Sequence, residues 1–431
     1  MRLDNDNLSY LAETDFRGTH KLFGIKQADR LHHLYLIGKT GVGKSTLLEL
    51  LIWQDLAAGR GFALIDPHGD LAERIWANCP EQLRERLTYF NVPDPTQPYG
   101  YNPLRRVRED RIPLAAAGLL ETMRKLWPTA WGVRMEHVLR NSLYALLERD
   151  GSDLSDILRL FSDKRFRREV TERIGNPVVK AFWKTEFENY PARLRADAVA
   201  PIQNKLGALL ADPTLRRVLV QPAADIHFRT LMDGSRGLLV NLSRGQLGED
   251  ASHVLGGLVV TTIGLAGFSR GEVPAAQRVP FYLFVDEFQS FTTLSFVNMM
   301  SELRKFGVGL TLAHQYLNQL EPEIRHAVLG NAGTLVTFRL GAEDAPYVAA
   351  ELRPTINTED LVSLANHSIY LKLMIDGTPS KPFSARTLAL RSCDDECFDK
   401  RVAERLELRA ETDERPFSEC PDSDLDASDE C

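Results

Sequence analysis

Gly38-Lys39-Thr40-Gly41-Val42-Gly43-Lys44-Ser45 is the stretch of sequence that decides the fold. It fits the phosphate-loop pattern G-x-x-x-x-G-K-[ST]. An apolar, strand-like run at 34–37 precedes it, and a run with helical spacing at 46–51 follows it. A loop in this position turns several backbone N–H groups toward one anion, and the helix that begins there adds the positive end of its dipole. The sequence therefore predicts a nucleotide-binding site.

The residue types in this loop predict separate roles. Lys44 is expected to reach the β- and γ-phosphates of the nucleotide, and Ser45 is expected to hold Mg²⁺. ATP with Mg²⁺ is the expected ligand pair. The residues expected to bind it are Gly38, Lys39, Thr40, Gly41, Val42, Gly43, Lys44, Ser45 and Thr46.

A second strand-like run ends in two acidic residues. Phe281-Tyr282-Leu283-Phe284-Val285 is followed at once by Asp286 and Glu287. Because the carboxyl ends of parallel strands meet at one edge of a sheet, both carboxylates are expected beside the phosphate loop. We expect Asp286 to join the Mg²⁺ shell opposite Ser45, and Glu287 to be the general base for the attacking water. The plainer alternative is a strand end with a solvated Asp-Glu pair.

Two more polar residues are candidates for the hydrolysis step. Gln315 comes just after the strand-like run 308–313, where its side chain would touch the γ-phosphate and orient the water. Arg304 precedes the same run and cannot easily reach the nucleotide of its own subunit, so we expect it to act as an arginine finger on a neighbouring subunit. A surface turn at Gln315 and a solvated Arg304 are the alternatives, and His314 is interpreted as structural.

Asp66 closes the predicted strand at 62–65 and stands near the phosphate loop. The turn that follows, Pro67-His68-Gly69-Asp70, contains a glycine suited to a tight bend. A supporting role for Asp66 beside the nucleotide is expected in preference to a metal site shared with His68.

Short apolar runs alternate with helical patterns along most of the chain, which predicts an α/β fold with a doubly wound, mainly parallel sheet. One connection, from Asp66 to Leu238, is too long for a simple crossover. No strand is predicted after Tyr99 within it, and helical spacing recurs instead. The prediction is an inserted all-α domain at 105–235 within a nucleotide-binding domain made of 22–104 and 236–392, with an N-terminal extension at 1–21.

The charge of the chain is unevenly distributed. The formal net charge is −7, but residues 411–431 contain nine acidic side chains and one basic side chain, so the remainder is close to neutral. We expect 393–431 to be an acidic, disordered tail. Cys393 and Cys397 lack a second pair of ligands, so a zinc site is not expected, and the scattered cysteines fit a reducing cytoplasm.

In their order along the chain, these motifs resemble the HerA/FtsK superfamily of ring ATPases. The phosphate loop, the Asp66–Asp70 turn, the helical insertion, Asp286-Glu287, the Glu302-x-Arg304-Lys305 element and Gln315 all take part in the likeness, which covers about 22–390. The chain looks most like the soluble motor part of type IV secretion coupling proteins and their TraG-like relatives. The resemblance implies a RecA-like P-loop NTPase that assembles as a hexamer and pumps DNA through a central channel by hydrolysing ATP.

Three functions remain open at this point. The first is a DNA-translocating ring ATPase of conjugation or type IV secretion. The second is a HerA-like translocase partnered with a nuclease in DNA end processing or phage defence. The third is an assembly ATPase that acts on protein substrates of a secretion machine. DNA-dependent ATPase activity would separate the first two from the third.

Expected partners follow from the first reading: DNA, further copies of the chain, and a relaxase, secretion-channel or nuclease protein. Arg244, in the loop after the strand at 238–242, is the candidate for holding a DNA phosphate. An ordinary turn is the alternative there. No apolar stretch is recognised as long enough to span a bilayer, so we expect a cytoplasmic protein without a transmembrane segment of its own, recruited to the inner membrane by a partner.

Overall fold

The computed structural model describes residues 7–15, 20–220, 222–291 and 300–388. The predicted tail at 393–431, with Cys393, Cys397, Cys420 and Cys431, lies outside these residues. Cys79 is a buried free thiol.

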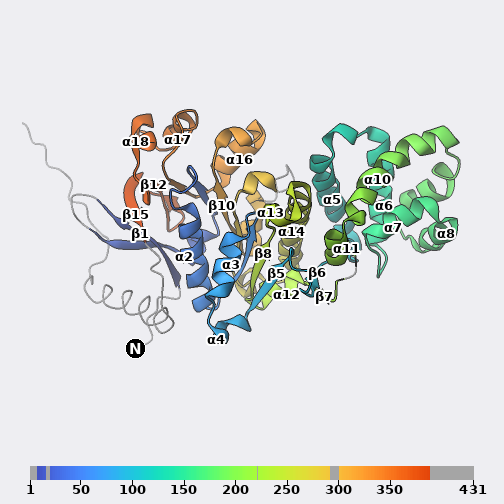
Figure 1. Ribbon diagram of the computed structural model, residues 1–431, viewed down its shortest axis with the longest axis horizontal. Helices are drawn as coiled ribbons and strands as arrows, with labels where there is room; N and C mark the ends of the chain where they lie inside the picture. The colour runs from blue at the N-terminus through green and yellow to red at the C-terminus, as the bar shows by residue number, and fades with distance from the viewer. Residues whose placement is uncertain (1–6, 16–19, 221, 292–299, 389–431) are drawn as a thin grey trace, which may run out of the picture. The chain divides into compact units, whose positions relative to one another are not determined.

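An eleven-stranded sheet runs through the centre, in the order β2-β1-β15-β12-β11-β3-β10-β9-β4-β8-β5 (Figure 1). The seven strands from β11 to β5 are parallel, and β12, β15, β1 and β2 extend the sheet in antiparallel fashion. The fold is therefore α/β with a mainly parallel sheet, as the alternation predicts. The strands of the main sheet are β1 (Leu8–Thr14), β2 (Leu22–Lys26), β3 (Leu34–Ile37), β4 (Gly61–Asp66), β5 (Leu87–Asn91), β8 (Gly237–Asn241), β9 (Phe281–Val285), β10 (Val308–His314), β11 (Thr334–Thr337), β12 (Ser368–Lys372) and β15 (Phe383–Thr387).

Every residue of β3, β4, β8, β9, β10 and β11 is buried. Strands covered by helices on both faces have nearly continuous apolar sequences, which is why they can be predicted from the sequence. The helices of the nucleotide-binding domain are α1 (Gln27–Arg30), α2 (Lys44–Ala57), α3 (Asp70–Ala77), α4 (Glu81–Arg84), α13 (Arg244–Leu247), α14 (Glu249–Ser269), α16 (Pro322–Asn331), α17 (Ala345–Glu351) and α18 (Thr358–Ser363).

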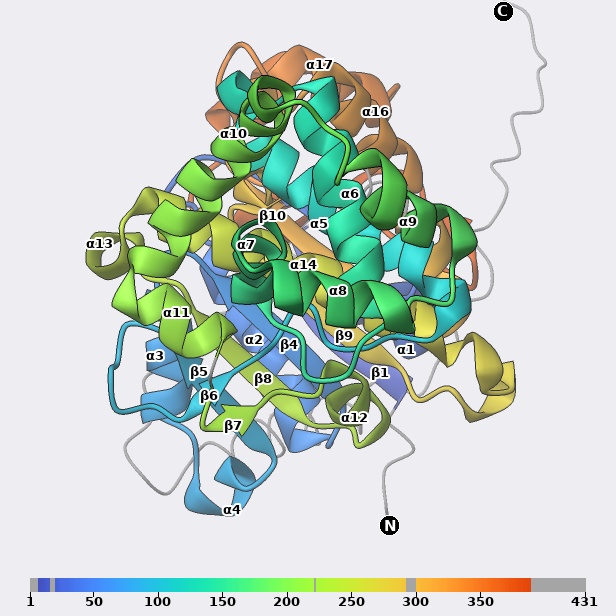
Figure 2. The same cartoon turned by 90° about the vertical axis from the view of Figure 1, so that its right-hand side faces the viewer.

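Between β6 (Tyr99–Gly100) and β8 the chain is almost entirely helical (Figure 2). The helices there are α5 (Ile112–Leu126), α6 (Val133–Leu147), α7 (Leu154–Ser162), α8 (Lys164–Arg173), α9 (Pro177–Ala181), η4 (Phe182–Glu186), α10 (Ala192–Ala211), α11 (Pro213–Leu219) and α12 (Phe228–Asp233). One short strand interrupts them, because β7 (Ala224–Asp225) pairs with β6. We call the segment from α5 to α12 the insertion.

The insertion contacts the rest of the fold through α5 and α12, which both pack against α14. Where α5 meets α14, Thr122 Oγ1 lies 3.2 Å from Thr261 Oγ1. A side chain in place of Gly118 would press within 2.6 Å of Thr261, so the glycine permits the close approach of the two helices. The insertion therefore shares one continuous core with the sheet.

Two expectations need correction. Leu8–Thr14 form β1 within the main sheet, between β2 and β15, and so do not precede the sheet as an extension. The expectation that no stretch is long enough to span a bilayer is also wrong, because Glu249–Glu272 passes that test by length and composition. Of the 18-residue apolar stretch tested within this helix, 78% is buried inside the fold, as in the core helix of a soluble protein.

Candidate functional site

The strand order brings the predicted site residues to one edge of the sheet. The phosphate loop follows β3, Gln315 follows β10, Asp286 follows β9, and Asp66 ends β4. Because β3, β10, β9 and β4 are consecutive parallel neighbours, these residues lie side by side at the carboxyl edge. Ligands of open α/β sheets bind at this edge.

In the phosphate loop, the side chain of Lys44 binds backbone carbonyls of the loop itself. Lys44 is buried, and its Nζ donates to the carbonyl oxygens of Gly38 at 2.6 Å and Lys39 at 2.9 Å. Gly43 has a φ of 119°, a conformation that a side chain would strain, and it leads directly into α2. Burial lowers the pKa of Lys44, while Asp286 and Glu287 act in the opposite direction. The ammonium thus stands at a helix N-terminus among carboxylates.

Asp286 and Glu287 are both buried at the end of β9. Burial, together with the charges of Asp66 and Glu287, raises the pKa of Asp286 to about 7, and the charge of Lys44 acts in the opposite direction. Glu287 has φ 47° and ψ 49°, in the left-handed region that a residue with a side chain seldom adopts. Strain of this kind, together with crowded carboxylates, is typical of functional sites.

Hydrogen bonds connect the phosphate loop to Glu287. Thr40 Oγ1 donates to Gln315 Oε1 at 2.8 Å, and Gln315 Nε2 donates to Glu287 Oε1. The other oxygen of the carboxylate, Oε2, accepts from Gln289 Nε2 at 2.6 Å. The amide of Gln315 therefore lies between the loop and the acid.

Asp66 serves the backbone in this structure. Its Oδ1 accepts from the N–H of His68, and its Oδ2 accepts from the N–H groups of Leu71 and Ala72, all at 2.9 Å. These bonds tie the carboxylate to the first turn of α3, while its charge still acts on Asp286.

His314 is buried beneath the site, where its Nδ1 lies 3.0 Å from the hydroxyl of Tyr35. Burial, aided by Lys44, lowers its pKa to about 3, so the imidazole is neutral.

The donor set at this edge fits a magnesium ion. Mg²⁺ prefers oxygen ligands and is usually held by one or two carboxylates together with substrate phosphates. Asp286 supplies a buried carboxylate close to the charges of Asp66 and Glu287, and Ser45 at the start of α2 supplies a hydroxyl. Across the residues that the structure describes, no group of three or more His, Cys, Asp and Glu forms a separate metal cluster.

Arg304 lies at the opposite edge. It begins η8 (Arg304–Phe306), just before β10, and its Nη1 is 3.1 Å from Nδ1 of His32, just before β3. Both strands start there and end at the phosphate loop and Gln315. Arg304 is exposed and is separated from the phosphate loop of its own chain by the length of the sheet.

Arg244 is engaged inside the chain. Its guanidinium donates from Nη2 to Ser290 Oγ, and its backbone N–H donates to the carbonyl of Pro67 at 3.0 Å. The predicted contact with a DNA phosphate would require this side chain to leave Ser290, so the geometry here favours a structural role.

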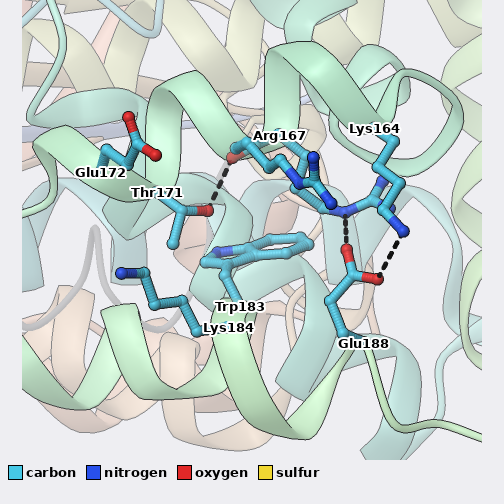
Figure 3. Close-up of a pocket in the computed structure, with 8 residues that line it drawn as sticks. Lys164, Arg167, Thr171, Glu172, Trp183, Lys184 and Glu188 are labelled. Carbon is cyan, nitrogen blue, oxygen red and sulfur yellow. Dashed lines mark hydrogen bonds and ion pairs between the residues drawn. The ribbon is translucent and has the colours of Figure 1, made fainter.

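The basic run at 164–168 lies on α8 and borders a cavity of about 290 Å³ in the insertion (Figure 3). Arg167 is buried and pairs with Glu188 at 2.9 Å, while Arg168 and Lys184 stand exposed at its border. The indole of Trp183, drawn at the centre of Figure 3, is itself buried. This cavity is formed by the insertion alone and includes none of the predicted site residues.

Gln289 is the residue that sequence reasoning missed. It stands three positions after Asp286 on η7 (Phe288–Ser290), and a polar residue just beyond the acidic pair was its only sequence signal. Only the folded backbone shows that its side chain turns back to Glu287.

Comparison with known proteins adds to this picture. Residues 27–218 match the family model described as "Helicase HerA, central domain". No curated protein matches the sequence.

Solved structures share the fold over most of the chain. The bacterial conjugative coupling protein TrwBΔN70 is 15% identical over 89% of this chain and 90% of its own, with a TM-score of 0.62. TrwB in complex with ADP and Mg²⁺ is 15% identical over 89% of this chain and 91% of its own, with a TM-score of 0.59. VirB4 of Thermoanaerobacter pseudethanolicus is 14% identical over 88% of this chain and 96% of its own, with a TM-score of 0.59. At this level of identity the likeness identifies the fold.

Proposed function

We propose that this chain is a P-loop ATPase of the HerA/FtsK type that hydrolyses ATP with Mg²⁺ to move DNA through a ring of its own copies. The observation that supports hydrolysis best is the hydrogen-bonded link from Thr40 through Gln315 to Glu287. A loop that only bound nucleotide would not need a buried, strained acid connected to it.

The residues of the site have separate chemical tasks in this proposal. Lys44 exchanges the carbonyls of Gly38 and Lys39 for phosphate oxygens, which its buried ammonium binds strongly. Ser45 and Asp286 hold Mg²⁺, which neutralises the charge of the phosphates when it is bound. Glu287 accepts a proton from the attacking water, and Gln315 orients that water.

The match to the HerA central domain and the fold shared with a conjugative coupling protein support DNA as the substrate. In this proposal the ring is a hexamer working in the cytoplasm, and the insertion, within 105–235, offers a surface to a relaxase, a secretion channel or a nuclease. Inner-membrane recruitment would come from that partner. TrwB with ADP and Mg²⁺ supports the choice of nucleotide and metal.

The decisive experiment measures the ATPase rate at one fixed salt concentration with no DNA, with single-stranded DNA and with double-stranded DNA. Stimulation by either form is expected, because a translocating ring binds phosphates without regard to sequence. Glu287→Gln should bind ATP normally and hydrolyse it at least about 10²-fold more slowly, as expected when a general base is lost.

Two results would contradict the proposal. A turnover unchanged by Glu287→Gln would show that another group is the base. A rate that depends on Glu287 but is indifferent to DNA would favour the assembly ATPase with protein substrates. The nuclease-partnered translocase would share the DNA stimulation and be distinguished by its co-purifying partner.

Variants of Arg304 would test whether the copies of the chain act on one another's nucleotides in a ring. Its place at the far edge of the sheet leaves it available to a neighbouring subunit's nucleotide, where an arginine finger would contribute about 10³–10⁵ to the rate. Arg304→Ala and Lys44→Ala proteins, each inactive alone, should partly restore one another's activity when mixed. If subunit exchange is demonstrated and no activity returns, Arg304 does not act across subunits.

A further inference from the structure

The short helix after Glu287 is held by two elements outside the strand that carries it. Lys125, in the last turn of α5, donates from Nζ to the backbone carbonyl of Gln289 at 2.9 Å. On the other side, Arg244 donates to the hydroxyl of Ser290. Lys125 of the insertion and Arg244 of α13 thus form hydrogen bonds to two consecutive residues of η7, Gln289 and Ser290.

The side chain of Gln289 turns back from this helix to the acid. Its Nε2 donates to Glu287 Oε2 at 2.6 Å, while Gln315 donates to Oε1. Both oxygens of the carboxylate are therefore fixed by amide donors, one from the nucleotide side and one from η7. Since Glu287 also has a left-handed backbone, its orientation depends on what holds the residues around it.

Packing fixes the end of the same segment. Phe291 is buried against α14, and a Cβ on Gly256 would lie only 2.1 Å from its ring. The helix α14 is also the surface on which α5 rests, through Thr122 and Thr261. A shift of α5 on α14 would therefore change the position of Lys125 relative to Gln289.

We propose that Lys125 and Gln289 are positioning residues that set the carboxylate of Glu287, so that ATP turnover depends on how α5 of the insertion is seated. This inference rests on the proposed function, because it requires Glu287 to be the general base. Binding of a partner to the insertion then reaches the chemistry through one lysine and one amide, without any change in the phosphate loop.

The arrangement has a specific chemical consequence. Each amide donor fixes one oxygen of the Glu287 carboxylate, so loss of the donor at Gln289 frees this side chain to rotate. A residue that merely filled space in the turn would not change the ratio of kcat to nucleotide affinity.

The test uses Lys125→Met and Gln289→Met in the full chain, each of which removes the donor and keeps an unbranched side chain. Both should lower kcat about tenfold, the size expected for one hydrogen bond to a charged group. Affinity for a non-hydrolysable ATP analogue should stay within about twofold of wild type, since neither residue reaches the phosphate loop.

Further variants separate positioning from structure. Lys125→Arg should restore most of kcat, and the double variant should lose little more than Gln289→Met alone, because both act through one carboxylate. Lys205→Met is the matched control: Lys205 is an exposed lysine of α10 in the same insertion, and its kcat should be unchanged.

The outcomes are distinguishable. A wild-type chain without ATP turnover, or one indifferent to Glu287→Gln, would overturn the proposed function and this inference with it. An active wild type that depends on Glu287, with Lys125→Met as active as Lys205→Met, would overturn the inference alone. So would equal losses of analogue affinity and kcat in both variants.

Discussion

Charged side chains are buried at both edges of the parallel sheet, but they are paired with opposite charges to different extents. At the amino edge, where β3 and β9 begin, Arg30 and Asp55 are fully buried and joined by two parallel hydrogen bonds of 2.6 and 2.7 Å. At the carboxyl edge, the carboxylates of Asp286 and Glu287 lie close to the ammonium of Lys44, and the charge of Asp66 also acts on Asp286.

The amino edge has the features of a finished structural element. Ser9 of β1 accepts a further bond from Arg30 at 2.9 Å, and the guanidinium carbon lies 3.6 Å above the ring of Tyr282. Planar fork-to-carboxylate pairing of this kind satisfies both charges at once. The hydrogen bond from Arg30 to Ser9 also ties β1 to this buried ion pair, which helps to hold the first strand in the sheet.

The carboxyl edge has an excess of negative charge and a strained Glu287. Its lysine is satisfied only by the carbonyls of its own loop. The comparison indicates that a buried charge stabilises the fold where a side chain of opposite charge pairs with it. Where no such side chain balances it, the buried charge is available to bind a ligand. Changes at the carboxyl edge should therefore affect chemistry, and changes at the amino edge should affect stability.

The largest effect should come from Lys44→Ala. Without this ammonium, nucleotide affinity and turnover should each fall by at least about 10²–10³-fold, because a buried donor to the phosphates is lost. The free energy of unfolding without nucleotide should change little. Nucleotide titration and denaturant unfolding of the same preparation measure the two quantities, with Lys205→Ala as the control. Normal affinity would refute the role of Lys44, and a large loss of stability would erase the contrast between the edges.

The next effect belongs to the amino edge. Arg30→Met should lower the free energy of unfolding by about 3–5 kcal/mol, because it leaves the buried carboxylate of Asp55 with Arg60, at 3.2 Å, as its remaining ion-pair partner among the described residues. The double change Arg30→Met with Asp55→Leu should recover most of this loss, since no unpaired charge remains. Urea unfolding provides the measurement. A single change costing less than about 1 kcal/mol would mean that this ion pair does not stabilise the fold.

The smallest effect is a pH dependence at the amino edge. His33 is buried and neutral: its Nδ1 accepts from the N–H of Leu310 at 3.1 Å, and its Nε2 donates to the carbonyl of Met300 at 2.8 Å. Burial lowers its pKa to about 4, and the neighbouring charges of His32 and Arg304 act in the same direction. Because the unfolded chain binds this proton more readily, the stabilisation is complete above about pH 6.5 and is lost as pH falls toward 4.

Between pH 7 and pH 5 this linkage amounts to about 2 kcal/mol. His33→Gln should remove that part of the acid sensitivity, although His314 contributes a dependence of the same sign. Unfolding free energies of wild type and variant at the two pH values measure the difference. Identical pH dependence in both would show that His33 is already protonated in the folded chain.

The sequence predicted the centre of the sheet better than its ends. The strands β3, β4, β8, β9 and β10 are mostly apolar and buried throughout, because helices cover both faces. The strands β1, β2, β5 and β15 were not predicted. They mix buried residues with partly exposed ones, and such a short mixed pattern resembles a loop.

Within the site, the same division applies. The phosphate loop and the acidic pair are recognisable because phosphate and magnesium demand particular residue types at fixed spacing. The engagement of Arg244 by Ser290, and of Glu287 by Gln289, follows from no spacing rule. Both depend on the direction that η7 takes after the left-handed Glu287.

By itself, the sequence determined that this chain has a phosphate loop, a parallel sheet and a mainly helical segment between β6 and β8, because those features depend on local periodicity and on the chemistry of a few adjacent residues. The tertiary structure alone decided which charges are matched and which are not. Arg30 meets Asp55 across 25 residues, and Lys125 meets Gln289 across 164. Such pairings depend on strand order and helix packing, and no local pattern in a single chain records them.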